Sequence, residues 1–296
     1  MHLRTVLREG RFAVTVEVVP PVSADPSLLL ARALPLKDLA DAVNVTDGPS
    51  ARVHMGALAA AGLLAANGIE PILQFTCRDR NRIALQADLL GAAALGVRNL
   101  LLLRGDAPGA GDEPAAKPVF DFETRDLLAA AAAMRDRGTL ASGAPLAGAK
   151  PDFFLGAGEL PVDPPPGWEP KSLKAKVEAG AEFVQTQFCM DLGVVRRYAA
   201  ALADAGLTAR APLLIGIAPL GSVRSALFIR KHLYGAVIPD ALVARLEAAA
   251  DPRAEGAAIC LELLYALAET PGVAGAHIMP IAHAALVPEV LRRFRR

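Results

Sequence analysis

The sequence carries no surplus of either charge and very little cysteine. Its 296 residues include 31 Lys and Arg against 31 Asp and Glu, so the formal net charge is zero. A protein that holds nucleic acid through its overall charge is therefore not expected. The three cysteines, Cys77, Cys189 and Cys260, lie far apart and form no Cys-x-x-Cys pair. They signal neither a disulfide framework nor a zinc site.

Several other signatures are also missing from the chain. The most apolar helical stretch, 57–66, is too short to cross a bilayer, and the N-terminal MHLRTVLREGRF lacks the apolar segment of a signal peptide. The histidines show no metal-ligand spacing such as His-Glu-x-x-His, and no Gly-x-Ser-x-Gly motif occurs. We therefore expect a cytoplasmic protein with no metal and no membrane or nucleic-acid partner.

What the sequence does contain is a regular alternation of strand-like and helix-like segments. The expected strands cover 12–19, 42–46, 71–77, 99–105, 153–158, 183–189, 212–218 and 276–281. Helices are expected near 27–40, 53–67, 80–96, 121–138, 170–180, 191–205, 222–232 and 283–294, with an extra piece over 240–270. Eight such units predict a single (β/α)8 barrel domain over residues 1–296. An open doubly wound sheet is the alternative, but no Gly-x-Gly-x-x-Gly follows the first strand.

Two insertions rich in Gly and Pro interrupt this alternation. They cover 106–121, after the fourth expected strand, and 158–170, after the fifth. Both follow the carboxyl ends of their strands, where the active sites of barrels are built. Loops of this length are more often functional than disordered, so both are candidates for a binding site.

The alternation within strands predicts which side chains face the barrel interior. In the stretch VTVEVVPP, Val14, Val16 and Val18 share one face, and Thr15 and Glu17 share the other. The large apolar residues suit the helix-facing side, so Glu17 should point inward near the carboxyl end of its strand. Three further strands place polar pairs at the same end: Asn44 with Thr46, Gln74 with Thr76, and Gln185 with Gln187. Polar side chains that converge from four strands favour a polar-ligand pocket over isolated core groups.

Two carboxylates are candidates for chemistry. Glu17 in an apolar wall is expected to have a raised pKa and to act as a general acid, with a salt bridge to a rim arginine as the alternative. Asp106 follows the buried run LLLLRG and lies at the same rim, either as a second functional carboxylate or as a turn cap. Gly105 beside it would allow a ligand to approach the backbone.

Basic and amide side chains give two weaker candidates. Arg78, Arg80 and Arg82 precede a long helix, for which Asp79 is the expected N-cap. They predict either a phosphate site or a solvated charged face. Gln185 and Gln187 offer both a donor and an acceptor, either to a heterocycle with an amide-like edge or to the backbone of the core.

Several segments together resemble the methylenetetrahydrofolate reductase family, in its short bacterial form, over nearly the whole chain. They are VEVVPP, VNVTDGPSARVHM, GIEPILQFTCRDRNRIALQADLLGAAALGVRNLLLLRGDAP, KVEAGAEFVQTQFCMD, GIAPLGS and GVAGAHIMPI. The resemblance implies a (β/α)8 barrel that reduces 5,10-methylenetetrahydrofolate to 5-methyltetrahydrofolate, as in one-carbon metabolism and methionine biosynthesis. A noncovalent FAD usually carries hydride from NAD(P)H in this family.

The resemblance also implies roles for individual residues. Glu17 matches the acid that protonates N10 of the folate, and Asp106 matches the carboxylate that contacts the pterin and tunes the flavin. Gln187 matches the glutamine that holds the pterin, and Gln185 and His283 are further expected substrate contacts. The cofactor positions implied in this way are Thr46, Gln74, Arg104, Gly105, Asp106 and Lys176.

The chain departs from the family pattern at Gln74, where many relatives have histidine, and at Val223, where some have phenylalanine. Three possibilities therefore stay open: hydride transfer through FAD, direct transfer from NADH as in some relatives, and a pterin-binding subunit that works with a methyltransferase or electron-transfer partner. We expect either a homo-oligomer or a complex with a partner subunit. An unrelated barrel lyase or aldolase is disfavoured, since no lysine ends a strand.

Overall fold

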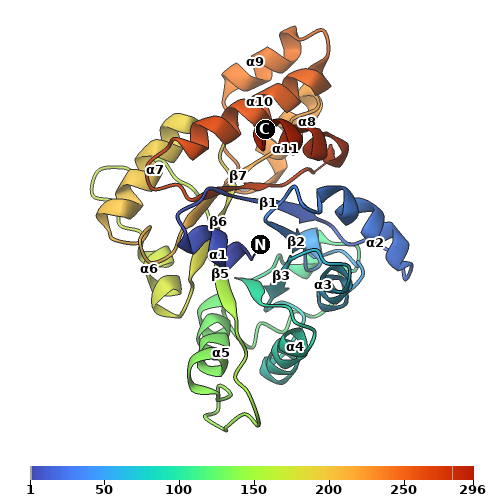
Figure 1. Cartoon of the computed structure of the whole chain (residues 1–296), viewed down its shortest axis with the longest axis vertical. Coiled ribbons are helices and arrows are strands. Elements are labelled where there is room, and N and C mark those ends of the chain that lie inside the picture. Colours follow the sequence, from blue (N-terminus) through green and yellow to red (C-terminus); the bar gives the residue numbers. More distant parts are fainter. Residues whose placement is uncertain (1, 282) are drawn as a thin grey trace.

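The computed structural model describes residues 2–281 and 283–296 and forms a closed parallel barrel surrounded by helices (Figure 1). Its eight strands are β1 (Ala13–Val18), β2 (Ala42–Val45), β3 (Pro71–Thr76), β4 (Asn99–Leu103), β5 (Phe154–Glu159), β6 (Phe183–Phe188), β7 (Leu213–Ile217) and β8 (Gly275–Ile278). Each strand pairs in parallel with the next, and β8 pairs with β1. The predicted (β/α)8 barrel is confirmed, and the open doubly wound sheet is excluded.

The described residues form α-helices that lie around the barrel and at its ends (Figure 1). They are α1 (Leu3–Arg8), α2 (Pro26–Ala33), α3 (Ala57–Ala66), α4 (Arg82–Ala94), α5 (Thr124–Arg137), α6 (Lys171–Glu178), α7 (Leu192–Asp204), α8 (Val223–His232), α9 (Asp240–Ala248), α10 (Pro252–Ala268) and α11 (Val287–Phe294). The extra piece expected over 240–270 is the pair α9 and α10. No helix in this part of the chain has the length and apolarity needed to cross a membrane.

Helix boundaries follow local chemistry that periodicity alone does not resolve. The expected helix over 27–40 ends early, because Pro35 lies in the 3-10 turn η1 (Leu34–Leu36) that follows α2. Helix α4 is capped by Asn81 rather than by the expected Asp79. The Asn81 Oδ1 accepts the amides of Ile83 and Ala84, both at 3.1 Å.

The amino-terminal end of the barrel is filled by apolar side chains and closed by α1, a helix that the sequence analysis does not predict. Figure 1 shows α1 lying across the barrel. Leu3, Val6 and Leu7 of this helix pack against the first inward residues of the strands, in a cluster that also contains Ala13, Ala42, Ile72, Leu101, Phe154, Phe183 and Leu214. The rings of Phe154 and Phe183 stack there with centroids 4.8 Å apart.

The outward faces of the strands form a second and larger core against the helices. Val14, Val16 and Val18 of β1 belong to it, whereas Ala13 belongs to the interior cluster. The predicted alternation of β1 is therefore confirmed. The later inward positions of β1, toward its carboxyl end, are taken by the polar side chains of Thr15 and Glu17.

Candidate active site

The barrel interior turns polar toward the carboxyl ends of its strands. Asn44 and Gln185, both buried, exchange two hydrogen bonds across the interior: Asn44 Nδ2 donates to Gln185 Oε1 at 2.7 Å, and Gln185 Nε2 donates to Asn44 Oδ1 at 3.1 Å. Gln185 Nε2 also donates to Thr15 Oγ1 at 2.9 Å. The amide of Gln185, a predicted substrate contact, is thus engaged by the barrel itself, as buried polar groups require.

Glu17 lies above this layer, and its partners are polar side chains of two other strands. Gln74 Nε2 of β3 donates to Glu17 Oε2 at 2.9 Å, and His277 Nε2 of β8 lies 3.8 Å from the same oxygen. The side chain of Glu17 is 18% exposed. No arginine pairs with it among the described residues, so the rim salt bridge considered for Glu17 does not form.

A cleft of about 310 Å³ opens beside Glu17 and gathers six of the residues predicted for the site. Its lining includes Glu17, Thr46, Gln74, Arg104, Gly105 and Asp106. They lie at or just beyond the carboxyl ends of β1 to β4, whereas Gln185 and Gln187 of β6, which the sequence places with them, are not part of this lining. The hydroxyl oxygen of Thr46 is buried and has no hydrogen-bond partner in the described chain. An unpaired buried hydroxyl at a cleft is a group that a ligand can satisfy.

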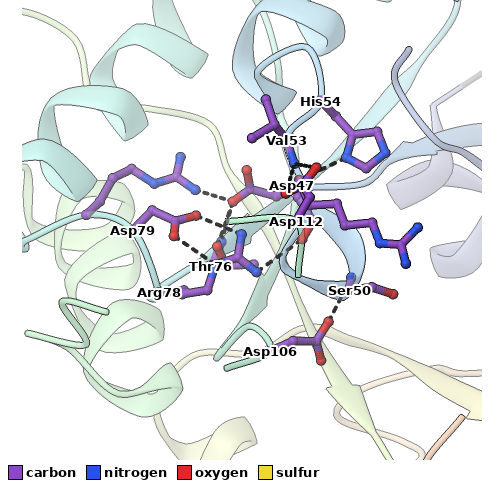
Figure 2. A network of polar contacts seen from close by, with 12 residues as sticks. Asp47, Ser50, Val53, His54, Thr76, Arg78, Asp79, Asp106 and Asp112 are labelled. Atoms are coloured by element: carbon purple, nitrogen blue, oxygen red, sulfur yellow. Dashed lines mark hydrogen bonds and ion pairs between the residues drawn. The ribbon is translucent and has the colours of Figure 1, made fainter. Parts of the chain in front are cut away.

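The Gly105 backbone and the Asp106 carboxylate form one wall of this cleft. Gly105 has a φ of +90°, and a Cβ there would lie 3.0 Å from the Cβ of Thr76, so both conformation and space favour glycine. Asp106 is exposed, and its Oδ2 accepts the backbone amide of Ser50 at 3.0 Å. The carboxylate is therefore positioned by the loop that follows β2 (Figure 2).

We call residues 106–121, the insertion after β4, the strap, because it is tied to the loop after β2. Asp112 accepts the amide of Val53 with both oxygens at 3.1 Å, as Figure 2 shows. Gly111 lies so close to Ala51 that a Cβ would come within 1.8 Å of the Ala51 carbonyl oxygen. Ser50 and Ala51 have φ values of 56° and 55°, which side chains rarely adopt. The strap is thus held against the loop after β2, and its first residue, Asp106, lines the cleft.

Asp47, which is not among the residues predicted from the sequence, also lines the cleft and connects the loop after β2 to β3 and the loop beyond it. Its Oδ2 accepts the amide and the hydroxyl of Thr76, both at 2.9 Å, and pairs with Arg80. Arg78 donates to the carbonyl of Gly48 at 3.1 Å, next to Asp47 (Figure 2). The sequence does offer one signal for a role of Asp47 in the site: it directly follows Thr46 at the carboxyl end of β2. Its partners come from β3 and the loop beyond, which only the folded chain brings together.

The three arginines after β3 are engaged by carboxylates. Arg78 pairs with Asp79, Arg80 with Asp47 and Asp88, and Arg82 with Asp121. Hydrogen bonds from Arg82 hold the pKa of Asp121 down at about 2. The three arginines thus form arginine–aspartate pairs. Arg78 is 5% exposed, so the solvated charged face expected as the alternative to a phosphate site does not describe this residue.

Four other predicted residues have partners of their own. The Arg104 guanidinium, at the edge of the cleft, stacks 4.0 Å from the Phe120 ring and pairs with Glu123. Lys176, Gln187 and His283 do not line the cleft. Lys176 Nζ donates to the Gly158 carbonyl at 2.8 Å and to Glu159 at 3.0 Å, Gln187 Oε1 accepts the Phe188 amide at 3.1 Å, and His283 Nε2 lies 3.3 Å from Ser225 Oγ.

A larger cavity of about 720 Å³ lies at the amino-terminal ends of the strands, far from these groups in the barrel. Several of the charged side chains in its wall pair with one another, as Arg295 does with Asp41 and His2 does with Glu70. In barrels this end contributes stability rather than chemistry. The smaller cleft at the carboxyl ends, with its unpaired hydroxyl and its carboxylates, is therefore the candidate active site.

The fold and the cleft define the class of the protein: a (β/α)8 barrel with a polar site at the carboxyl ends of its strands. Residues 2–295 match the model of the family described as methylenetetrahydrofolate reductase. The chain belongs to this family, as the sequence resemblance predicts.

One curated relative and two solved structures illustrate the likeness. A protein of Caenorhabditis elegans named "Probable methylenetetrahydrofolate reductase (NADPH)" is 25% identical over 241 residues, which cover 79% of this chain and 33% of that protein. The chain thus spans about a third of the length of this relative.

An uncharacterized protein from Clostridium thermocellum that binds two copies of 5-methyl-5,6,7,8-tetrahydrofolic acid superimposes with a TM-score of 0.58, 14% identity, and coverage of 98% of this chain and 96% of that one.

The second structure is DmoA from Hyphomicrobium sulfonivorans, with a TM-score of 0.57, 10% identity, and coverage of 96% of this chain and 88% of that one. At these identities the two structures show a shared fold and nothing further about the site.

Proposed function

We propose that the protein reduces 5,10-methylenetetrahydrofolate to 5-methyltetrahydrofolate with hydride that originates from NAD(P)H. The observation that carries the proposal is the position of Glu17 at the cleft, between Gln74 and His277 and without a pairing arginine. Family membership supports the same reaction, and so does the similarity to the C. elegans protein named as a probable methylenetetrahydrofolate reductase.

Glu17 is the proposed acid of this reaction. Its proton passes to N10 of the folate, the N10–methylene bond breaks, and the methylene carbon stays on N5 as an iminium cation. Hydride addition to that carbon then gives the methyl group. A proton donor at the substrate is required for ring opening, and a carboxylic acid within a pocket that limits its contact with water suits this role.

Asp106 is the proposed partner of the cation. Its carboxylate lines the cleft that Glu17 also borders and is fixed by the Ser50 amide. A fixed negative charge near a developing cation stabilises it without reorganisation of the site. Gln187 and His283 remain proposed substrate contacts, although they lie on β6 and after β8 rather than in the cleft lining. Gln185 does not suit this role, because it is 3% exposed and its amide is hydrogen-bonded to Asn44 and Thr15.

We propose FAD as the hydride carrier, because the cleft has features that suit a flavin. The Thr46 hydroxyl lacks a partner, and the Gly105 backbone lines the cleft. Thr46, Gln74, Gly105 and Asp106 are the residues that would hold the group at the cleft, and Arg104 and Lys176 are the proposed cations for its diphosphate. When bound, FAD supplies a two-electron relay between NAD(P)H and the folate.

An absorption spectrum and a turnover assay test the proposal. The purified protein, alone and after addition of FAD, is expected to show a flavin band and to oxidise NAD(P)H when 5,10-methylenetetrahydrofolate is supplied. Turnover by a colourless protein that takes up no FAD would replace the flavin route with direct hydride transfer. Folate binding without NAD(P)H oxidation would contradict the reductase function and favour the subunit that works with a partner.

A further inference from the structure

We propose that His277 is a positioning residue that presents its Nε2–H to the carboxyl group of Glu17 and stabilises the carboxylate that forms when Glu17 gives up its proton. This inference rests on the proposed role of Glu17 as the acid. His277 lies on β8, is 2% exposed, and pairs in register with Thr15 of β1. Because β1 carries Thr15 and Glu17 on the same inward face, one imidazole reaches both side chains.

The two ring nitrogens of His277 have different neighbours. Nδ1 lies 3.0 Å from Thr15 Oγ1, which is hydrogen-bond distance. Nε2 lies 3.8 Å from Glu17 Oε2, too far for a hydrogen bond but close enough for an electrostatic contact. The hydrogen bond at Nδ1 therefore decides which tautomer faces Glu17.

The direction of the hydrogen bonds assigns that tautomer. Thr15 Oγ1 accepts from Gln185 Nε2 at 2.9 Å, which leaves the hydroxyl proton of Thr15 to donate. The nearest acceptor is His277 Nδ1 at 3.0 Å, whereas the Ala276 carbonyl lies at 3.5 Å. A neutral imidazole that accepts at Nδ1 carries its proton on Nε2. The Nε2–H group thus faces the carboxylate.

The orientation of Gln185 is itself fixed by its paired amide bonds with Asn44. A polar relay therefore runs from Asn44 through Gln185, Thr15 and His277 to Glu17. The other charged groups that line the cleft have separate partners: Asp47 with Arg80, Arg78 with Asp79, Arg104 with Glu123, and Asp106 with the Ser50 amide. Glu17 Oε2 therefore has two polar neighbours: Gln74 Nε2, which donates to it at 2.9 Å from β3, and His277 Nε2, which faces it at 3.8 Å from β8.

A donor that faces a carboxyl group stabilises its charged form and lowers its pKa. Once Glu17 has given its proton to the substrate, the His277 N–H stabilises the carboxylate that remains. Removing the N–H withdraws this stabilisation from the carboxylate, so protonated Glu17 should persist to higher pH in the variant. General acid catalysis needs protonated Glu17, so the fall in rate with rising pH should also move to higher pH.

Thr15 gives a matched pair of variants. Thr15→Val keeps the shape of the side chain and removes the hydroxyl, whereas Thr15→Ser keeps the hydroxyl. ¹⁵N NMR of the full chain without substrate should find the Nε2–H tautomer of His277 in the wild type and in Thr15→Ser, and a mixture in Thr15→Val. The His277 signals are assigned by their loss in His277→Gln.

The second measurement follows the Glu17 carboxyl group by pH-dependent infrared difference spectroscopy against Glu17→Gln. We expect its titration to move upward in His277→Phe and Thr15→Val and to stay in place in Thr15→Ser. The pH profile of folate turnover should move in parallel, with KM unchanged.

An Nδ1–H tautomer in the wild type, or a Glu17 titration that does not move in Thr15→Val, would overturn the proposal. Neither spectroscopic measurement depends on turnover. Failure of the reductase assay with intact spectroscopic shifts would therefore refute the proposed function and leave the relay standing.

Discussion

The two ends of the barrel interior are built from the same strands but from opposite chemistry. On β1 the inward residues run Ala13, Thr15, Glu17, and on β3 they begin with Ile72 and continue with Gln74. Each step of two residues moves one layer toward the carboxyl end, and on both strands the first of these steps replaces an apolar side chain with a polar one. The amino-terminal layers provide stability, and the carboxyl-terminal layers provide the site.

The largest effect is expected at the apolar end. Ile72→Ala removes a fully buried side chain from the interior cluster and should lower the free energy of unfolding by about 2–5 kcal/mol. Chemical denaturation measures this loss. Gln74→Leu, two residues further on the same face, is the matched variant. It removes the hydrogen bond to Glu17 and should lower folate turnover, while the free energy of unfolding changes far less. Equal losses of stability in the two variants would contradict the division into two ends.

Glu17→Gln should give the next largest effect, at the polar end. The side chain keeps its size but cannot donate an acidic proton, so folate reduction should fall by roughly 10² or more. Oxidation of NAD(P)H with an artificial acceptor should be spared, because that reaction requires no proton on N10. Steady-state assays with both acceptors measure the difference. Unchanged folate turnover would make Glu17 a structural residue.

A smaller effect is expected from the strap. A methyl group in Gly111→Ala meets the Ala51 carbonyl and pushes the strap from the loop that fixes Asp106. Displacement of a positioned group by a fraction of an ångström should reduce kcat/KM about tenfold. Gly109→Ala is the control, because no atom lies within 4 Å of the added methyl. If both variants behave alike, the strap does not position Asp106.

The smallest effect is expected outside the barrel, at the exposed pair of Arg82 and Asp121. Hydrogen bonds from Arg82 lower the pKa of Asp121 from 3.8 to about 2. The pair therefore contributes stability above about pH 4 and loses it as the pH falls toward 2. The difference in denaturation midpoint between the wild type and Asp121→Asn should shrink over that interval. A difference that is independent of pH would contradict the assignment.

The sequence predicts the eight strands and their inward faces well, because both depend on local patterns. The valines of β1 alternate with Thr15 and Glu17, and that period of two fixes their faces in any sheet. Helix α1 escapes prediction because six residues are too few for a periodic signal. Its role depends on the interior cluster that Leu3 and Val6 complete.

The composition of the cleft is predictable in part, but its hydrogen-bond partners are not. Glu17, Thr46 and Asp106 lie at or within a few residues of the carboxyl ends of β1, β2 and β4, so their convergence follows from barrel geometry. The contact of Glu17 with His277 arises only when β8 closes on β1, 260 residues later in the chain (277 − 17 = 260). The role of Asp47 is not predictable for the same reason, since its partners, Thr76 and Arg80, belong to β3 and the loop after it.

The amide pair of Asn44 and Gln185 has a mechanical consequence. Strands β2 and β6 stand opposite each other in the ring of eight, so the two hydrogen bonds form a strut across the bore. Two hydrogen bonds between opposite strands resist a change in the distance between β2 and β6 at this layer. The width of the interior below the cleft is thus set by side chains inside the barrel and not by the surface loops.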